Sequence, residues 1–275
     1  MKIWKRLFKI VLGIVVFSVI MVIINMIPTW NLKVKGMHEL KGNWVNVYYE
    51  TEEEAAKDVF ELADINAEEI AKKLSFSNKQ DVNIYIYDNQ ITMQTKKYGF
   101  VAPLLGLDWY IGDNIGTNVI LTSPANPGKV HDYNNNKTAV LHEIVHAYVS
   151  VINPHISLWL TEGLALYLSN GEPYNKSYLD SHDIPTFSDI QTKSPLKFSD
   201  IGGYSLAHTY IEYLNVNFGW DKVLELIRTE DYNKVFGMSE KEIYSKWVDY
   251  ISNYYLYNFS SMNFADLTND MLCSS

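Results

Sequence analysis

The sequence of 275 residues contains one cysteine, Cys273, so a disulfide within it is excluded. The fold must therefore be stabilised by a packed core. Hydrophobic residues make up 47% of the chain and 20 residues are tyrosine, which is typical of a packed globular protein. A chain of this length is long enough for one large domain or for two lobes beyond any membrane segment.

Positive charge is also scarce. Lys and Arg number 23 against 32 Asp and Glu, and four of the basic residues lie within the first nine positions. Binding to nucleic acid requires a basic surface, which this composition does not supply. We therefore expect no nucleic-acid partner.

Charged residues are absent from residues 10–27, where only Ser18 and Asn25 are polar. An apolar run of this length is able to cross a lipid bilayer. Four basic residues and no acidic residue precede the run, and few basic residues follow it, so the positive-inside rule predicts a cytoplasmic amino terminus. The rest of the chain would then be extracellular, attached to the cell membrane by a single-pass anchor.

A cleaved signal peptide is the alternative interpretation of this run. Residues 25–30, Asn-Met-Ile-Pro-Thr-Trp, do not form the small-x-small cleavage site that a signal peptide needs. The sequence therefore favours the uncleaved anchor.

The residues typical of a catalytic metal site are His142, Glu143 and His146, in the run His-Glu-Ile-Val-His. On a helix, residues four apart lie about 40° around the axis and about 6 Å along it, so the two imidazoles can bind one ion. Glu143 would project beside the metal, where a carboxylate can take a proton from water. Two histidines and a glutamate are a known catalytic zinc set, and Glu162 completes it.

The alternative is a helix with two partly buried histidines and one surface carboxylate. The neighbouring residues favour the metal site. Apolar side chains over residues 140–152 predict a buried helix, which the Asn153-Pro154 pair ends. A second helix beginning near Ser157 would carry Glu162 back past the first.

The His-Glu-Ile-Val-His run, followed by Trp-Leu-Thr-Glu-Gly-Leu-Ala over residues 159–165, resembles the gluzincin metallopeptidases and in particular their compact peptidase-MA-like members. The resemblance covers roughly residues 43–252 and implies one zinc ion, with a peptide or protein as substrate. The Trp-Leu-Thr-Glu-Gly segment is also similar to M1 aminopeptidases. The Gly-x-Met-Glu-Asn strand that holds a substrate's amino terminus in that family is absent, so we expect an endopeptidase.

One residue departs from the thermolysin-like pattern. Leu166 stands where that pattern has an aspartate that orients a histidine, so another group must orient the imidazole here.

In gluzincins the strand just before the zinc helix is the edge of the sheet, and the substrate lines up against it. The resemblance assigns that role to Val119, Ile120 and Leu121. An edge strand offers backbone groups to an extended peptide. An ordinary buried strand is the alternative.

The substrate oxygen that gains negative charge needs a hydrogen-bond donor besides the metal. The resemblance places a tyrosine ahead of a long helix, which makes Tyr204 the candidate. His208, one turn later on the same helix face, is the alternative donor. Either residue could instead be part of the packing.

The fold class predicted from the local patterns is α+β. The expected elements are strands at residues 44–49, 82–87 and 118–122, a helix from a Thr51–Glu54 capping box to Leu74, and helices after Lys137. We expect three parts: residues 1–30 as cytoplasmic stub and transmembrane anchor, 31–136 as a mixed-sheet α/β lobe, and 137–275 as a mainly helical lobe. The zinc site would lie between the lobes.

The predicted function is that of a membrane-anchored extracytoplasmic zinc metallopeptidase with Glu143 as general base. The alternative is a non-catalytic surface binding module on a gluzincin scaffold, motivated by Leu166 and the unassigned donor. The presence of Glu143 argues against the module, because a scaffold without chemistry does not need that carboxylate. The sequence leaves the oligomeric state open.

Overall fold

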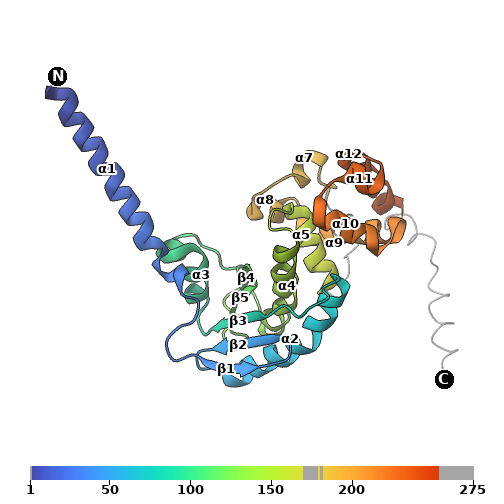
Figure 1. The fold of residues 1–275 in the computed structure, drawn as a ribbon, viewed down its shortest axis with the longest axis horizontal. Coiled ribbons are helices and arrows are strands. Elements are labelled where there is room, and N and C mark those ends of the chain that lie inside the picture. Colours follow the sequence, from blue (N-terminus) through green and yellow to red (C-terminus); the bar gives the residue numbers. More distant parts are fainter. Residues whose placement is uncertain (1, 170–178, 180–181, 254–275) are drawn as a thin grey trace. The chain divides into compact units, whose positions relative to one another are not determined.

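The computed structural model describes residues 2–169, 179 and 182–253. The chain forms two compact units, Met1–Ala147 and Tyr148–Ser275, and the division falls within the helix that carries His142, later than the expected boundary at residue 136. Helices and one small mixed sheet make up the structure (Figure 1), which confirms the predicted α+β class.

The first unit opens with the helix α1 (Lys2–Met26) and the short 3-10 helix η1 (Ile27–Trp30). Among the described residues, this is the one helix that is long and apolar enough to cross a membrane, and a signal sequence has the same properties. No part of its apolar window is buried inside the protein. The side chains of this window are therefore exposed.

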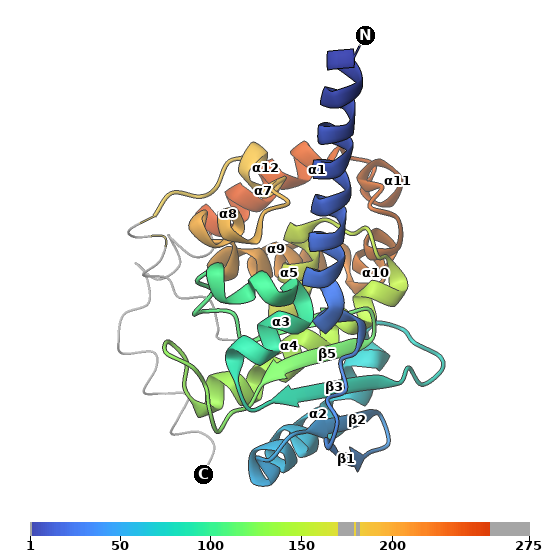
Figure 2. The same cartoon turned by 90° about the vertical axis from the view of Figure 1, so that its left-hand side faces the viewer.

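Five strands form the sheet, in the order β1-β2-β3-β5-β4. Figure 2 shows β5, β3, β2 and β1 as neighbours in this order. The strands are β1 (His38–Lys41), β2 (Val45–Tyr49), β3 (Val82–Tyr87), β4 (Gly112–Ile115) and β5 (Asn118–Thr122). The three inner strands are parallel, and each outer strand is antiparallel to its neighbour. The predicted strands correspond to β2, β3 and β5, whereas β1 and β4 were not predicted.

The strand β5 is not at the edge of the sheet, so the predicted edge role of Val119, Ile120 and Leu121 is wrong. It pairs with β3 on one side and with β4 on the other, and all three side chains are fully buried. The edge on this side is β4. Its sequence, Gly-Asp-Asn-Ile, has little intrinsic strand preference, and a hairpin turn through Gly116, whose φ is +58°, pairs it with β5.

A ladder of amides crosses the three parallel strands near their amino ends. Asn46 Nδ2 donates to Asn83 Oδ1 at 3.2 Å, and Asn83 Nδ2 donates to Asn118 Oδ1 at 3.2 Å. These residues are also register partners in the sheet. The ladder therefore holds the parallel strands in one alignment.

Helices α2 (Glu53–Lys73) and α3 (Gln90–Tyr98) pack against the sheet of the first unit, and the 3-10 helix η2 (Gly99–Leu104) follows α3 and packs against it. The α2 helix buries a stripe of small residues, including Ala56, Ala63 and Ala67, which are fully buried. Met93 of α3 packs with Tyr87, Tyr110 and Ile120 in a buried cluster on one side of β5. Leu121 points to the other side of the strand, because side chains alternate along it.

The amino end of α4 (Tyr133–Ile152) is attached to α2 through Asp58. Its carboxylate accepts a hydrogen bond from the Tyr133 hydroxyl at 2.9 Å and lies 3.2 Å from the Lys137 ammonium. The helix ends at Ile152, immediately before the Asn153-Pro154 pair, as the sequence predicted.

The second unit contains helices and connecting loops, and no strand occurs among its described residues. Its helices are α5 (Leu158–Leu168), α7 (Phe187–Ile190), α8 (Pro195–Asp200), α9 (Gly203–Phe218), α10 (Trp220–Thr229), α11 (Tyr232–Phe236) and α12 (Glu240–Ile251). Trp159 of α5 is central to the packing, with its ring centroid 5.6 Å from that of Phe198 and 5.7 Å from that of Trp247. The indole N–H of Trp247 donates to the Thr209 hydroxyl at 2.9 Å, which satisfies that buried donor.

Candidate metal centre

The two histidines of the His-Glu-Ile-Val-His run face each other from successive turns of α4. Their Nε2 atoms are 3.0 Å apart, and their rings are inclined by 80° with centroids 4.6 Å apart. Two nitrogen lone pairs at this separation repel each other unless a proton or a cation lies between them. The pair thus has the geometry of two ligands converging on one position.

Glu162 of α5 adds a carboxylate to this pair. One donor atom from each of His142, His146 and Glu162 lies within 4.8 Å of the other two, so the group could hold a metal ion. The ligand atoms of a tetrahedral zinc ion are about 3.4 Å apart, given metal–ligand distances of about 2.0–2.1 Å. The Oε2 atom of Glu162 is shielded from solvent, as expected of a donor directed into the protein.

The position of Glu162 is fixed by close packing of α5 on α9. A Cβ atom at Gly163 would lie 2.6 Å from the Ala207 carbonyl oxygen and 3.1 Å from Ile211 Cγ1. Only glycine therefore allows the two backbones to approach so closely. The crossing places Gly163, which follows Glu162, against Ala207, which precedes His208.

Glu143 lies on α4 between the two histidines and is 8% exposed. Its side chain packs against the edge strand β4, because a Cβ atom at Gly112 would lie 3.2 Å from both Cγ and Oε1 of Glu143. The same Cβ atom at Gly112 would lie 3.3 Å from Leu121 Cδ1. The glycine leaves the carboxylate room beside β4, the edge strand of the sheet.

The two predicted hydrogen-bond donors lie on α9. Tyr204, in its first turn, is 38% exposed, and its ring packs edge-on against Phe198 with centroids 4.9 Å apart. His208 is more deeply placed. Burial lowers the pKa of His208 below its usual value, and the nearby Glu212 only partly opposes this shift. The imidazole is accordingly neutral near pH 7.

No model of a known protein family matches the sequence, and a search of curated proteins finds no match either. The function is therefore inferred from the residues and geometry of the site itself.

Two glycines that position the site were not predicted from the sequence. Gly163 directly follows the predicted ligand Glu162 inside a predicted helix. A glycine at such a position indicates close packing, so this role could have been predicted. Gly112 had no such signal, because its strand was not recognisable and Glu143 is distant from it along the chain.

Proposed function

We propose that this chain is a zinc metallopeptidase of the gluzincin type, anchored in the cell membrane by α1 and acting outside the cytoplasm on peptides or proteins. The observation that supports this most is the grouping of His142, His146 and Glu162, with Glu143 beside them on α4. Two imidazoles and a carboxylate, with no thiolate, are a donor set suited to catalytic zinc.

Zinc bound by three protein ligands would supply Lewis-acid chemistry, polarising the substrate carbonyl and lowering the pKa of water. The Glu143 carboxylate accepts the proton of the attacking water and then donates it to the nitrogen of the leaving amine. The new C–O bond forms first, and the peptide C–N bond breaks once its nitrogen has received the proton, so the products are a carboxylate and an amine. The burial of Glu143 limits competing contact with bulk water.

The substrate strand would pair with β4, which replaces β5 in this role. Thr122 N donates to Ile111 O at 2.8 Å, so residues 111 and 113 make the inner hydrogen bonds of this antiparallel pair. The amide and carbonyl groups of Gly112 and Asn114 then point to the outer side. Lys97 Nζ donates to Asn114 O at 3.1 Å, in keeping with that direction. An extended peptide paired at Gly112 would pass beside the Glu143 carboxylate.

His208 is the better of the two candidates for the donor to the substrate oxygen. A neutral imidazole can donate one N–H hydrogen bond, and burial maintains the neutral form near pH 7. His208 also directly follows Ala207 at the crossing with the helix of Glu162. Tyr204, in contrast, is partly exposed and packed against Phe198.

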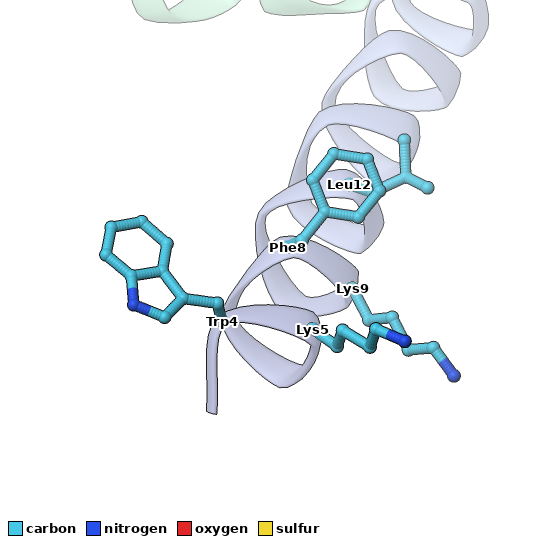
Figure 3. A pocket seen from close by; sticks show the side chains of 5 residues that line it. All are labelled: Trp4, Lys5, Phe8, Lys9 and Leu12. Carbon is cyan, nitrogen blue, oxygen red and sulfur yellow. The ribbon is translucent and has the colours of Figure 1, made fainter. Parts of the chain in front are cut away.

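The amino-terminal part of α1 has side chains that suit the cytoplasmic face of a bilayer. A surface hollow on this helix is lined by Trp4, Lys5, Phe8, Lys9 and Leu12 (Figure 3). The two lysine side chains extend on one side of the helix and Trp4 on the other (Figure 3). Apolar side chains one turn apart suit lipid chains, while lysine ammonium groups can reach the headgroups.

The test of the function is the Glu143→Gln variant of the full chain in detergent micelles. We expect zinc content, measured by atomic absorption, to match wild type while hydrolysis of an unfolded protein substrate falls about 100- to 10,000-fold, because the variant lacks the general base. Glu61→Gln, at an exposed position of α2, is the matched control and should leave both values unchanged. Equal hydrolysis by the Glu143 variant would refute the proposal.

A second variant tests the position of Glu143 rather than its chemistry. Gly112→Ala should displace the carboxylate by a few tenths of an ångström and lower kcat about tenfold, since misplacement of about 1 Å can cost about 100-fold. Zinc content should be unchanged. A wild-type kcat would show that β4 does not position Glu143. A zinc-loaded protein that binds a partner but cleaves no peptide in a broad library would favour the non-catalytic module.

A further inference from the structure

The segment that follows α3 exposes an unusual number of apolar side chains. We call Phe100, Val101, Leu104 and Leu105 the η2 patch; their exposed fractions are 58%, 42%, 84% and 45%. Ile65 and Val130 are also exposed, but each stands as a single residue in its segment. Single exposed apolar residues are ordinary, whereas a contiguous group indicates a surface that contacts another apolar phase.

The η2 patch is joined directly to the end of α1. The Asn25 side chain donates from Nδ2 to Tyr98 O at 3.1 Å and accepts at Oδ1 from Val101 N at 2.9 Å. Gly99 has a φ of +75°, and a Cβ atom there would collide with the Asn25 carbonyl oxygen. Figure 1 and Figure 2 both show the last turn of α1 beside α3. The patch is therefore fixed at the level of Asn25 along the helix.

The level of Asn25 corresponds to the outer boundary of a bilayer that α1 spans. Residues 10–27 extend about 27 Å as a helix, close to the thickness of the hydrocarbon core, and Asn25 lies about 3 Å from the outer end. Trp30, just beyond that end, is 68% exposed and suits the headgroup region. The η2 patch thus lies where lipid chains meet headgroups.

We propose that the η2 patch is a second membrane contact, which inserts Phe100 and Leu104 into the outer lipid boundary beside the anchor. This inference depends on the proposed anchoring by α1 and not on the zinc chemistry. Two contacts, one through α1 and one through η2, restrict the orientation of the first unit relative to the bilayer, which a single flexible anchor would not do. The partner is the lipid bilayer itself, as the continuity of the patch with α1 indicates.

The experiment places a nitrobenzoxadiazole fluorophore on single cysteines in the full chain, with Cys273→Ser as background. The labelled positions are Leu104→Cys in the η2 patch, Val16→Cys within α1, and Ile65→Cys as an exposed control on α2. The protein is reconstituted in nanodiscs of phosphatidylcholine with phosphatidylglycerol, so that both membrane faces are accessible. Doxyl-labelled lipid quenches fluorophores in the membrane, and iodide quenches those in water.

We expect the Leu104 label to be quenched by doxyl lipid and to be several-fold less sensitive to iodide than the Ile65 label, because an apolar side chain inserted about 5–10 Å is shielded from aqueous ions. A Leu104 label as sensitive to iodide as the Ile65 label, with Val16 still protected, would overturn the inference while leaving the anchor intact. Protection from iodide without quenching by doxyl lipid would also overturn it, in favour of a protein partner or a second copy. Iodide sensitivity at Val16 would refute both the anchor and the inference.

Discussion

Two helices of this protein are strongly apolar, and they use that property in opposite ways. The α1 helix has 25 residues, and its apolar window has no buried part. The α5 helix has only 11 residues, and more than half of its length is buried, including Trp159, Leu160 and Leu164. Composition alone does not separate a membrane helix from a core helix, whereas length and the partner of the apolar surface do.

The polar residues in these helices show the same contrast. Asn25 satisfies its amide through the backbone of Tyr98 and Val101, so it joins α1 to its own unit. Glu162 is the one charged residue of α5, and its carboxylate belongs to the candidate metal group. A charge in an apolar helix is costly to stability unless it is paired or bound to a metal, so its presence supports a functional role.

The largest expected difference between the helices concerns their aromatic side chains. Trp159→Ala should lower the free energy of unfolding by about 3–5 kcal/mol, because it opens a cavity beside Phe198 and Trp247. Phe17→Ala, at a position of α1 that is 64% exposed, should leave it nearly unchanged. Chemical denaturation of the full chain in micelles measures both values. Equal losses would show that α1 is packed against the protein after all.

The next largest effect concerns the charge in α5. Glu162→Gln should weaken zinc binding about 100- to 1000-fold, equivalent to about 3–4 kcal/mol, because one of three ligands loses its charge. Titration against a chromophoric chelator measures the affinity. Zinc should raise the Tm of wild type but, at the same concentration, not that of the variant. Wild-type affinity in the Gln variant would remove Glu162 from the ligand set.

Replacing a glycine by alanine in α5 and in α1 should give a smaller difference in stability between the two helices. Gly163→Ala must separate α5 from α9 and should cost about 1–3 kcal/mol of stability, as overpacking of a core does. Gly13→Ala has nothing within 4 Å of the new methyl group, so it should be neutral or slightly favourable to the α1 helix. Thermal unfolding of the two variants compares them. A neutral Gly163→Ala variant would contradict the close crossing.

The smallest effect is expected from Asn25→Leu, which makes the end of α1 fully apolar. The variant loses two hydrogen bonds worth about 0.5–1.5 kcal/mol each, and contact of the new apolar side chain with lipid, on the proposed membrane span, offsets part of this loss. Amide hydrogen exchange at residues 98–105 should become faster, and the rest of the first unit should be unchanged. Unaltered exchange in this segment would show that Asn25 does not hold η2.

Local sequence signals were reliable where packing and local preference agreed. The alternation in residues 82–87 and 118–122 predicted β3 and β5, Asn153-Pro154 predicted the end of α4, and α5 begins directly after Ser157. The pairing of His142 with His146 also follows from helix geometry alone, and their Nε2 atoms do converge. These features depend on residues that are close together in the chain.

The features that the sequence did not predict depend on partners far apart in the chain. Thr51 does not cap α2 as predicted; its hydroxyl instead bonds with Asp88, and its N–H donates to the same carboxylate at 3.4 Å. The edge position of β4 depends on the hairpin at Gly116 and on Lys97, whose ammonium lies 2.8 Å from the Asp113 carboxylate. The Thr51–Asp88 contact has no local pattern, and the weak strand propensity of residues 112–115 gave no signal for β4 although its turn is nearby.

The amide ladder through Asn46, Asn83 and Asn118 has a consequence for how the chain tolerates insertions. The central amide, Asn83, accepts from Asn46 and donates to Asn118. Shifting one strand by a single residue would therefore break the row and turn the apolar side chains of that strand to the wrong face of the sheet. Added residues in the loops between strands leave the row intact. Length variation should therefore be accepted in those loops and rejected inside β2, β3 and β5.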